Sequence, residues 1–271
     1  MIALGYTMVY GIAKMLNFAH GDIIMVGGYV IFVMMATNNP LLAVLAAVIA
    51  CVLLGIVIER IAYRPLRGAS PLAVLITAIG VSYLLQSMAQ IIFGSATKMV
   101  TVYEFGAVKF LGATIQVSSL VTMAVTIVVM TVLTLFVKFT RLGRAMIAVS
   151  EDREAAQLMG INVNGIITIT FAIGSSLAAL AGLFYLLKAP SVSSTMGAMP
   201  GIKAFTAAVI GGIGSIPGAM LGGILLGVVE CISAKITVIS PYTDAIEFSI
   251  LILILLVKPT GFLGKKRREK V

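Results

Sequence analysis

The sequence predicts an all-α fold, a polytopic transmembrane bundle of about seven to eight segments with one broken, glycine-rich segment. First, 60% of the residues are hydrophobic and only 11% are charged, against roughly 25% charged in soluble domains. Second, the apolar runs are continuous, as in Val44–Ile58 and Val121–Val137, whereas barrel strands alternate apolar and polar residues. Since lipid leaves backbone groups no external partner, continuous runs indicate helices. We expect one transmembrane domain over residues 1–271.

The N-terminal stretch does not by itself predict a span. Thirteen residues precede Lys14, fewer than the ~20 that cross a bilayer. A polar segment follows, with Asn17, His20 and Asp22 between apolar runs. Ionisable groups at membrane depth are often functional, but a short loop at the water boundary has the same composition. Both readings stay open.

The remaining chain contains a series of apolar runs. The clear candidate spans are Leu41–Ile58, Pro71–Phe93, Val117–Val137, Ile166–Leu187 and Ala245–Val257. Ile23–Ala36 is a shorter run. Ala204–Ser233 is long, but glycines and Pro217 interrupt it between residues 211 and 218.

Lysine and arginine clusters predict the orientation, because cytoplasmic loops carry the excess of basic residues. The clusters are Arg60, Arg64 and Arg67; Lys138, Arg141, Arg144 and Arg153; and Lys265, Lys266, Arg267, Arg268 and Lys270. If all three are cytoplasmic, 204–233 crosses twice or not at all. We expect a re-entrant hairpin of two half-helices, each of roughly 10 to 16 residues, broken at Gly214–Pro217.

The basic loop at about 139–165 predicts a short helix. Ser150 is a suitable N-cap, Glu151 places negative charge on the first turn, and Gly160 is a suitable C′ residue. Ala155, Leu158 and Met159 form one apolar stripe. A helix of about nine residues is marginal alone, so it needs a surface, either a partner or its own bundle and the lipid headgroups.

The broken segment has small residues at regular spacing. Gly214, Gly218 and Gly222 recur every four residues, as do Ala219, Gly223 and Gly227. Such stripes indicate close helix packing, or backbone that lines a solute path. Glu230 and Glu247, in or near the last spans, are candidates for a pore or a subunit contact, and equally for the interface with water.

Residues 154–160, EAAQLMG, read EAA-x-x-x-G and resemble the cytoplasmic coupling motif of ABC importer permeases. The resemblance implies that this helix docks on a separate ATPase subunit and transmits its nucleotide-driven closure. The residues that it implies for this coupling are Glu151, Glu154, Ala155, Ala156, Leu158, Met159 and Gly160.

Other segments are similar to the LivH-type permease of bacterial branched-chain amino acid ABC importers. The segments are ALGYTMVYG at 3–11, MLNFAHGD at 15–22, ERIAYRPLR at 59–67, KAF at 203–205 and GGIGSIPGA at 211–219. Family members usually carry more apolar sequence before the first of these, which implies a start further upstream or a short first helix. The candidate path residues are then Asn17, His20, Asp22, Gly214, Gly218 and Glu230.

The resemblance implies transport of leucine, isoleucine and valine across the inner membrane. Partners would be a second permease, identical or different, two cytoplasmic ATPases, an external solute-binding protein and membrane lipid. Related importers move urea, amides or other amino acids, so these substrates stay open. A stand-alone secondary transporter or channel is the alternative of another class.

Several classes of function find no support in the sequence. There is no phosphate-binding loop, no catalytic constellation and no metal-ligand spacing, so we expect no enzyme, cofactor or metal. The net charge of +9 reflects the excess of lysine and arginine in the predicted cytoplasmic loops. Nucleic-acid binding is not expected. The basic tail is interpreted as a topology anchor or as a site for anionic lipid.

Overall fold

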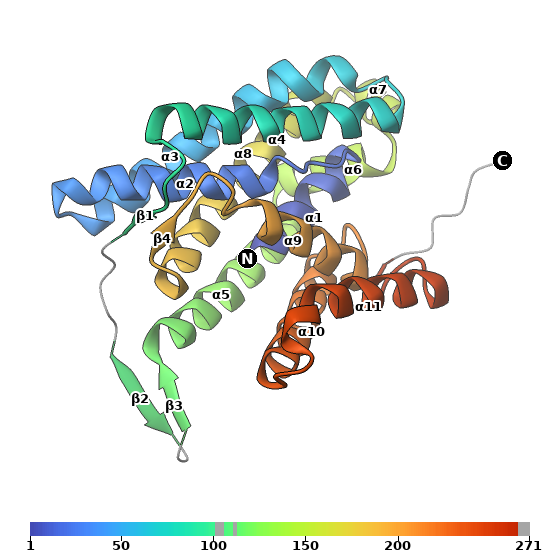
Figure 1. The fold of residues 1–271 in the computed structure, drawn as a ribbon. Helices are drawn as coiled ribbons and strands as arrows, with labels where there is room; N and C mark the ends of the chain where they lie inside the picture. The colour runs from blue at the N-terminus through green and yellow to red at the C-terminus, as the bar shows by residue number, and fades with distance from the viewer. Residues whose placement is uncertain (101–105, 111–112, 265–271) are drawn as a thin grey trace.

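Helices make up most of the computed structural model, which describes residues 1–100, 106–110 and 113–264 (Figure 1). The α-helices are α1 Ile2–Ala13, α2 His20–Met34, α3 Pro40–Ile58, α4 Pro71–Phe93, α5 Val117–Phe139, α6 Arg141–Glu151, α7 Arg153–Leu158, α8 Val163–Lys188, α9 Ala198–Gly211, α10 Ile216–Lys235 and α11 Thr243–Val257. Short 3-10 turns lie at Met35–Thr37, Arg64–Leu66 and Ser240–Tyr242, and a π-helical turn lies at Glu59–Tyr63.

Seven stretches of the described chain are long and apolar enough to cross a membrane. They are His20–Thr37, Pro40–Leu66, Pro71–Phe93, Val117–Phe139, Val163–Lys188, Ile216–Lys235 and Ser240–Val257. The predicted polytopic helical bundle is therefore confirmed. The apolar helices α1 and α9 are shorter, with 12 and 14 residues.

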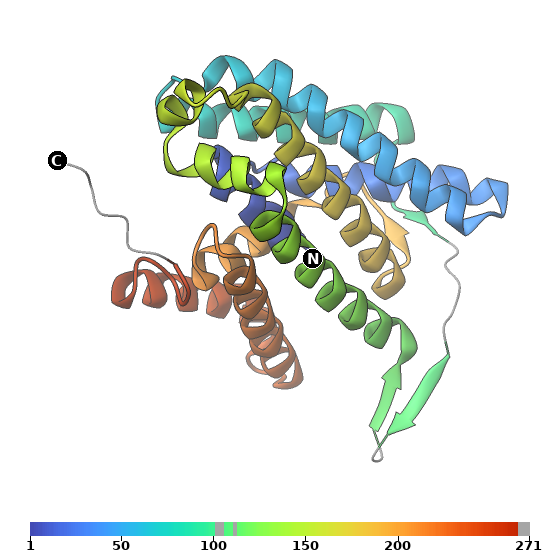
Figure 2. The same ribbon diagram turned by 180° about the vertical axis from the view of Figure 1, so that it is seen from behind.

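The bundle has an inner and an outer set of helices (Figures 1 and 2). Helices α1, α2 and α8 lie inside; α1 and α2 bury most of their residues, and α8 buries 12 of its 26. Their backbones approach closely: a Cβ added at Gly182 of α8 would lie 2.9 Å from the Ile24 carbonyl oxygen of α2. By contrast, α5 runs along the outside, buries only Leu133, and exposes many of its other apolar side chains as a lipid-facing helix would.

Two small antiparallel sheets lie at the end of the bundle away from α7, and the sequence did not predict them. β1 (Lys98–Met99) pairs with β4 (Ser191–Val192), tying the connection after α4 to that after α8. β2 (Ala107–Phe110) and β3 (Ala113–Gln116) form a ladder beyond the N-terminal end of α5 (Figure 1).

The broken segment is a helical hairpin, as predicted, but its second arm is longer than predicted. Gly212 and Gly214 adopt positive φ angles of 101° and 87° between α9 and α10, a conformation that glycine tolerates best. The Ser215 hydroxyl caps α10 by accepting from the Gly218 amide at 3.2 Å. Since the helix begins directly after the glycines, α10 reaches 20 residues. The prediction of 10 to 16 residues for this arm was wrong. The basic cluster 265–270 lies outside the described residues.

Candidate functional site

Two defined caps hold the short helix α7. Asp152 has an extended backbone, and its carboxylate accepts from the amides of Glu154 and Ala155, both at 3.0 Å. At the other end Gly160 has a φ of 80°, as predicted for a C′ residue. The Gly160 amide donates to Gln157 and the Ile161 amide to Ala156, the two bonds of a Schellman motif. Capping compensates for a length that would be marginal alone.

The predicted start of this helix was wrong. The Ser150 hydroxyl donates to the Ile147 carbonyl at 2.7 Å within α6, and Glu151 is the exposed last residue of α6. Asp152 is the cap instead: its backbone is extended between α6 and α7, and its carboxylate accepts from two amides of the first turn of α7. The loop therefore contains two helices, and Glu151 is not on the first turn of α7.

The outer face of α7 is apolar and open. Leu158 and Met159 are 89% and 82% exposed, and Ala155 is exposed beside them. Ala156 instead faces the protein and is buried. We call Ala155, Leu158 and Met159 the α7 tip. An apolar tip on a capped helix is typical of a contact surface.

One arginine ties α7 to the centre of the bundle. The Arg153 guanidinium donates to the Ala13 carbonyl oxygen at the C-terminal end of α1. Burial lowers the pKa of Arg153, and the nearby positive charge of Arg67 adds to this effect. On α1, Gly11 lies against Gly214: an added Cβ would be 2.9 Å from the Gly214 Cα. The α7 tip is thus connected through α1 to the break between α9 and α10.

The polar segment before α2 is buried inside the bundle. Asn17, His20 and Asp22 are each at most 3% exposed. Asn17 accepts from the Tyr63 hydroxyl at 2.9 Å, and Asp22 accepts from the Gln86 amide at 2.9 Å. The His20 ring packs edge-on to Tyr6, with 6.2 Å between centroids. These side chains link α2 to the π-helical turn and to α4. Whether they line the path or form a loop at the water boundary stays a prediction.

Comparisons with known proteins decide the family. The family model described as "Branched-chain amino acid transport system / permease component" matches residues 1–255. The chain is 45% identical to the high-affinity branched-chain amino acid transport system permease protein BraD of Pseudomonas aeruginosa, over 100% of this chain and 93% of that protein. It is 43% and 42% identical to the LivH permease proteins of Salmonella typhimurium and Escherichia coli, over 100% of this chain and 92% of each.

The chain belongs to the branched-chain amino acid transport permease family. This is a family of transport permeases and not of enzymes, and the seven apolar stretches make this member a multi-pass membrane protein. No solved structure matches the chain. In the described part of the permease, no group of three or more His, Cys, Asp or Glu side chains is arranged to hold a metal ion.

The two glycine stripes of the permease have different surroundings. Gly218 and Gly222 press against the Gly211 and Ala207 carbonyl groups of α9, so this stripe packs the hairpin. Gly223 and Gly227 have no atom within 4 Å of an added Cβ and line a pocket instead. Gly214 belongs to the break between the helices and not to the stripe on α10.

That pocket contains Glu230, a predicted path residue of the permease. Its volume is about 390 Å³, and Lys188, Lys203, Glu230 and Glu247 line it together with apolar side chains. We call it the lysine–carboxylate pocket. Because α8 runs from beside α7 to Lys188 over about 39 Å, the pocket lies toward the other end of the bundle. The predicted path residues therefore lie in three places: Asn17, His20 and Asp22 together, Gly214 and Gly218 at the break, and Glu230 here.

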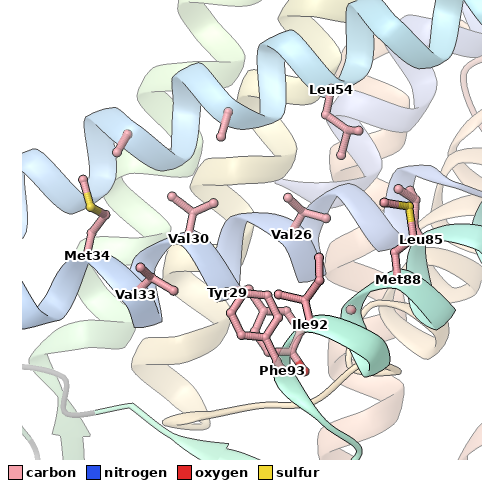
Figure 3. A pocket seen from close by; sticks show the side chains of 13 residues that line it. Val26, Tyr29, Val30, Val33, Met34, Leu54, Leu85, Met88, Ile92 and Phe93 are labelled. Atoms are coloured by element: carbon pink, nitrogen blue, oxygen red, sulfur yellow. The ribbon is translucent and has the colours of Figure 1, made fainter.

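A larger groove of about 510 Å³ separates α2, α3 and α4 of the permease (Figure 3). Side chains from all three helices point into it, including Val30, Leu54 and Met88. Tyr29 and Phe93 stack at 4.3 Å and bring the only aromatic rings to the lining. Apart from the Tyr29 hydroxyl these side chains are apolar, so the groove suits an aliphatic chain and cannot orient a charged solute.

Sequence reasoning missed a buried carboxylate beside the π-helical turn. Glu59 is fully buried and forms an ion pair with Arg67. It also accepts from the Thr168 hydroxyl at 2.7 Å, while Arg67 donates to Asn164. This network joins the connection between α3 and α4 to the first turns of α8. The sequence did contain a signal for this ion pair: Glu59 ends an apolar run and stands eight residues before Arg67.

Proposed function

We propose that this chain is the membrane-spanning permease subunit of an ABC importer for leucine, isoleucine and valine. The substrate is inferred from the names of the relatives, which are branched-chain amino acid transport permeases over the full length of this chain. The proposed partners are a second permease, two ATPases, an external solute-binding protein and membrane lipid. The pair of permeases is either identical or different.

The exposed apolar tip of α7 carries the part of the proposal that concerns coupling. Leu158 and Met159 are almost fully exposed at the end of a helix that is capped at both ends and tied to α1 by Arg153. Such a tip fits a groove on a partner protein, where its burial stabilises the complex. The proposed partner is the ATPase, and Glu151, Glu154, Ala155, Ala156 and Gly160 belong to the same proposed contact region.

Reconstitution tests the importer as a whole. The permease pair, the ATPases and the binding protein are placed in proteoliposomes, and leucine uptake is measured with and without ATP. We expect uptake only with ATP and all partners. Uptake by this chain alone, driven by an ion gradient, would contradict the ABC assignment. Preferred uptake of urea or an amide would keep the class and change the substrate.

Two substitutions test the coupling region. We expect Glu154→Lys and Gly160→Pro to abolish ATPase binding or its coupling to transport, with membrane insertion intact. Glu154 lies in the first turn of α7, and proline cannot adopt the positive φ of residue 160. Normal transport by both variants would show that α7 is only a surface helix.

The proposed orientation has its basic tail in the cytoplasm of the inner membrane, α7 on the same side and Ser240 outside. A cysteine at Ser240, in a background without the exposed Cys231, tests it with a membrane-impermeant thiol reagent. We expect labelling from the outside of intact cells. Labelling only after permeabilisation would place Ser240 inside and exclude the paired crossing of α9 and α10.

A further inference from the structure

The lysine–carboxylate pocket has the dimensions of a small-ligand site. It is formed by the ends of α8, α9, α10 and α11 and by the first residues of α1. Its volume of about 390 Å³ lies in the range of roughly 300–1,000 Å³ that is typical of ligand pockets. Gly223 and Gly227 leave its α10 wall free of side chains.

Carboxylates outnumber ammonium groups around Lys203. Its Nζ lies 2.9 Å from Asp244, 3.3 Å from Glu247 and 3.8 Å from Glu230. One ammonium has three donors and a single positive charge, so it cannot neutralise three carboxylates. The cluster therefore attracts a second cation.

Glu247 gives an independent indication of a ligand. Its side chain is 1% exposed, and it is the only buried residue in the fully described helix α11. Its Oε2 atom has no hydrogen-bond partner among the described residues, because Lys203 is within ion-pair distance but outside hydrogen-bond geometry. Lys203 donates to the other oxygen, Oε1, at 3.4 Å. A buried carboxylate oxygen that accepts no hydrogen bond is costly, and Glu247 is one of the residues that line the pocket.

The pocket also offers a cation and an apolar wall. Lys188, the last residue of α8, forms no ion pair with any residue that the structure describes. Ile2, Ala207 and Leu226 provide aliphatic surface in the same lining. Two glutamates beside Lys203, a second lysine without an ion pair and an apolar wall match the three parts of an aliphatic amino acid.

We propose that the lysine–carboxylate pocket is a binding site for a zwitterionic aliphatic amino acid on its way through the permease. Glu247 and Glu230 receive the ammonium group, Lys188 pairs with the carboxylate, and the aliphatic wall contacts the side chain. The choice of ligand rests on the proposed transport function, while the site itself rests on the charges and shape of the pocket.

Binding to the full-length permease in lipid nanodiscs tests this site. The ligands are leucine, isopentylamine, which lacks the carboxylate, and 4-methylpentanoate, which lacks the ammonium group. Each is titrated to about 10 mM, where a site with a millimolar Kd is mostly occupied. We expect leucine to bind more tightly than either fragment. Glu247→Gln weakens leucine and isopentylamine about tenfold and spares 4-methylpentanoate, whereas Lys188→Gln weakens leucine and 4-methylpentanoate and spares isopentylamine.

Lys235→Gln is the matched control, because Lys235 is exposed at the end of α10 and does not line the pocket. Glu247→Asp keeps a carboxylate and restores ammonium binding if the charge is what matters. An equal loss for all three ligands would make Glu247 purely structural and overturn the proposal, as would the absence of leucine binding to the unaltered protein. Leucine uptake by the whole importer without binding here would leave the transport function standing and remove this site.

Discussion

The α7 tip and the lysine–carboxylate pocket both depart from the usual pattern of buried apolar and exposed charged side chains. The tip exposes apolar side chains, and the pocket buries a charged one. At the tip, the apolar side chains of Leu158 and Met159 are exposed at the end of α7, in the basic loop between α5 and α8. In the pocket, Glu247 is buried on a helix whose other side chains are exposed or only partly buried. Exposed apolar surface and buried charge each cost free energy in the isolated chain.

The difference between the two regions indicates two kinds of missing contact. The tip offers area and shape without charge, which suits a protein surface. The pocket offers a concave site with charges at defined positions, which suits a small polar ligand. In the proposed importer, the contact with the ATPase and the contact with the solute therefore lie in separate regions of the permease.

Removing the apolar character of the tip should have the largest effect. We expect Leu158→Asp combined with Met159→Asp to weaken ATPase binding at least about 30-fold, since a central interface contact is worth roughly 2 kcal/mol. Copurification and ATP-dependent leucine uptake measure the loss. Leu142→Asp on α6 is the matched control, because Leu142 is also exposed but lies outside α7. Equal losses in both would deny the tip any special role.

Breaking the buried ion pair tests the pocket side of the comparison. We expect Lys203→Met to lower the free energy of unfolding by about 3 kcal/mol, because Glu247 then stays buried without a counterion. The double variant Lys203→Met/Glu247→Leu should recover most of that stability, as apolar replacements of buried pairs do. Thermal unfolding in detergent measures both. If the double variant is as unstable as the single one, the loss of stability does not come from burying Glu247 without a counterion.

The hairpin of α9 and α10 lies between the two regions, because its break contacts α1 and its helices line the pocket. Glycine substitutions on α10 test how closely the two helices pack. We expect Gly222→Ala to destabilise the protein by about 1–3 kcal/mol, since its Cβ would meet the Ala207 carbonyl of α9. Gly223→Ala is the matched comparison. It has open space and should stabilise the helix by up to about 1 kcal/mol. Similar melting shifts for both would contradict the close packing of α9 and α10.

The smallest expected effect concerns the start of α7. Asp152→Ala should cost about 1 kcal/mol of local helix stability by leaving the Glu154 and Ala155 amides without their acceptor. Hydrogen exchange at these two amides reports the loss. Glu151→Ala, which removes a neighbouring acid that caps neither helix, should leave exchange unchanged. Faster exchange in that variant instead would mean that Glu151 supports the first turn of α7, as the sequence predicted.

Local features of the sequence were predicted well, because local physics decides them. Gly160 ends α7 and the glycines at 212 and 214 break the hairpin, since both sites need a positive φ. The start of α7 was mistaken because two good caps, Ser150 and Asp152, stand two residues apart, and propensity alone does not rank them.

The parts that were missed depend on contacts between distant segments. Thr168 meets Glu59 across 109 residues, and Arg153 meets Ala13 across 140. The depth of Asn17, His20 and Asp22 has the same origin, because α4 and the π-helical turn supply the partners of two of them. A periodic pattern tells which face of a helix is apolar, but not which helix will cover it.

The carboxylate that α11 buries has a consequence for the order in which the chain is assembled. A helix whose buried side chain is Glu247 enters lipid at a cost that only a counterion offsets. That counterion is Lys203, 44 residues earlier in the chain. Prior placement of α9 therefore favours insertion of the last span, and biosynthesis delivers the cation before the acid that needs it.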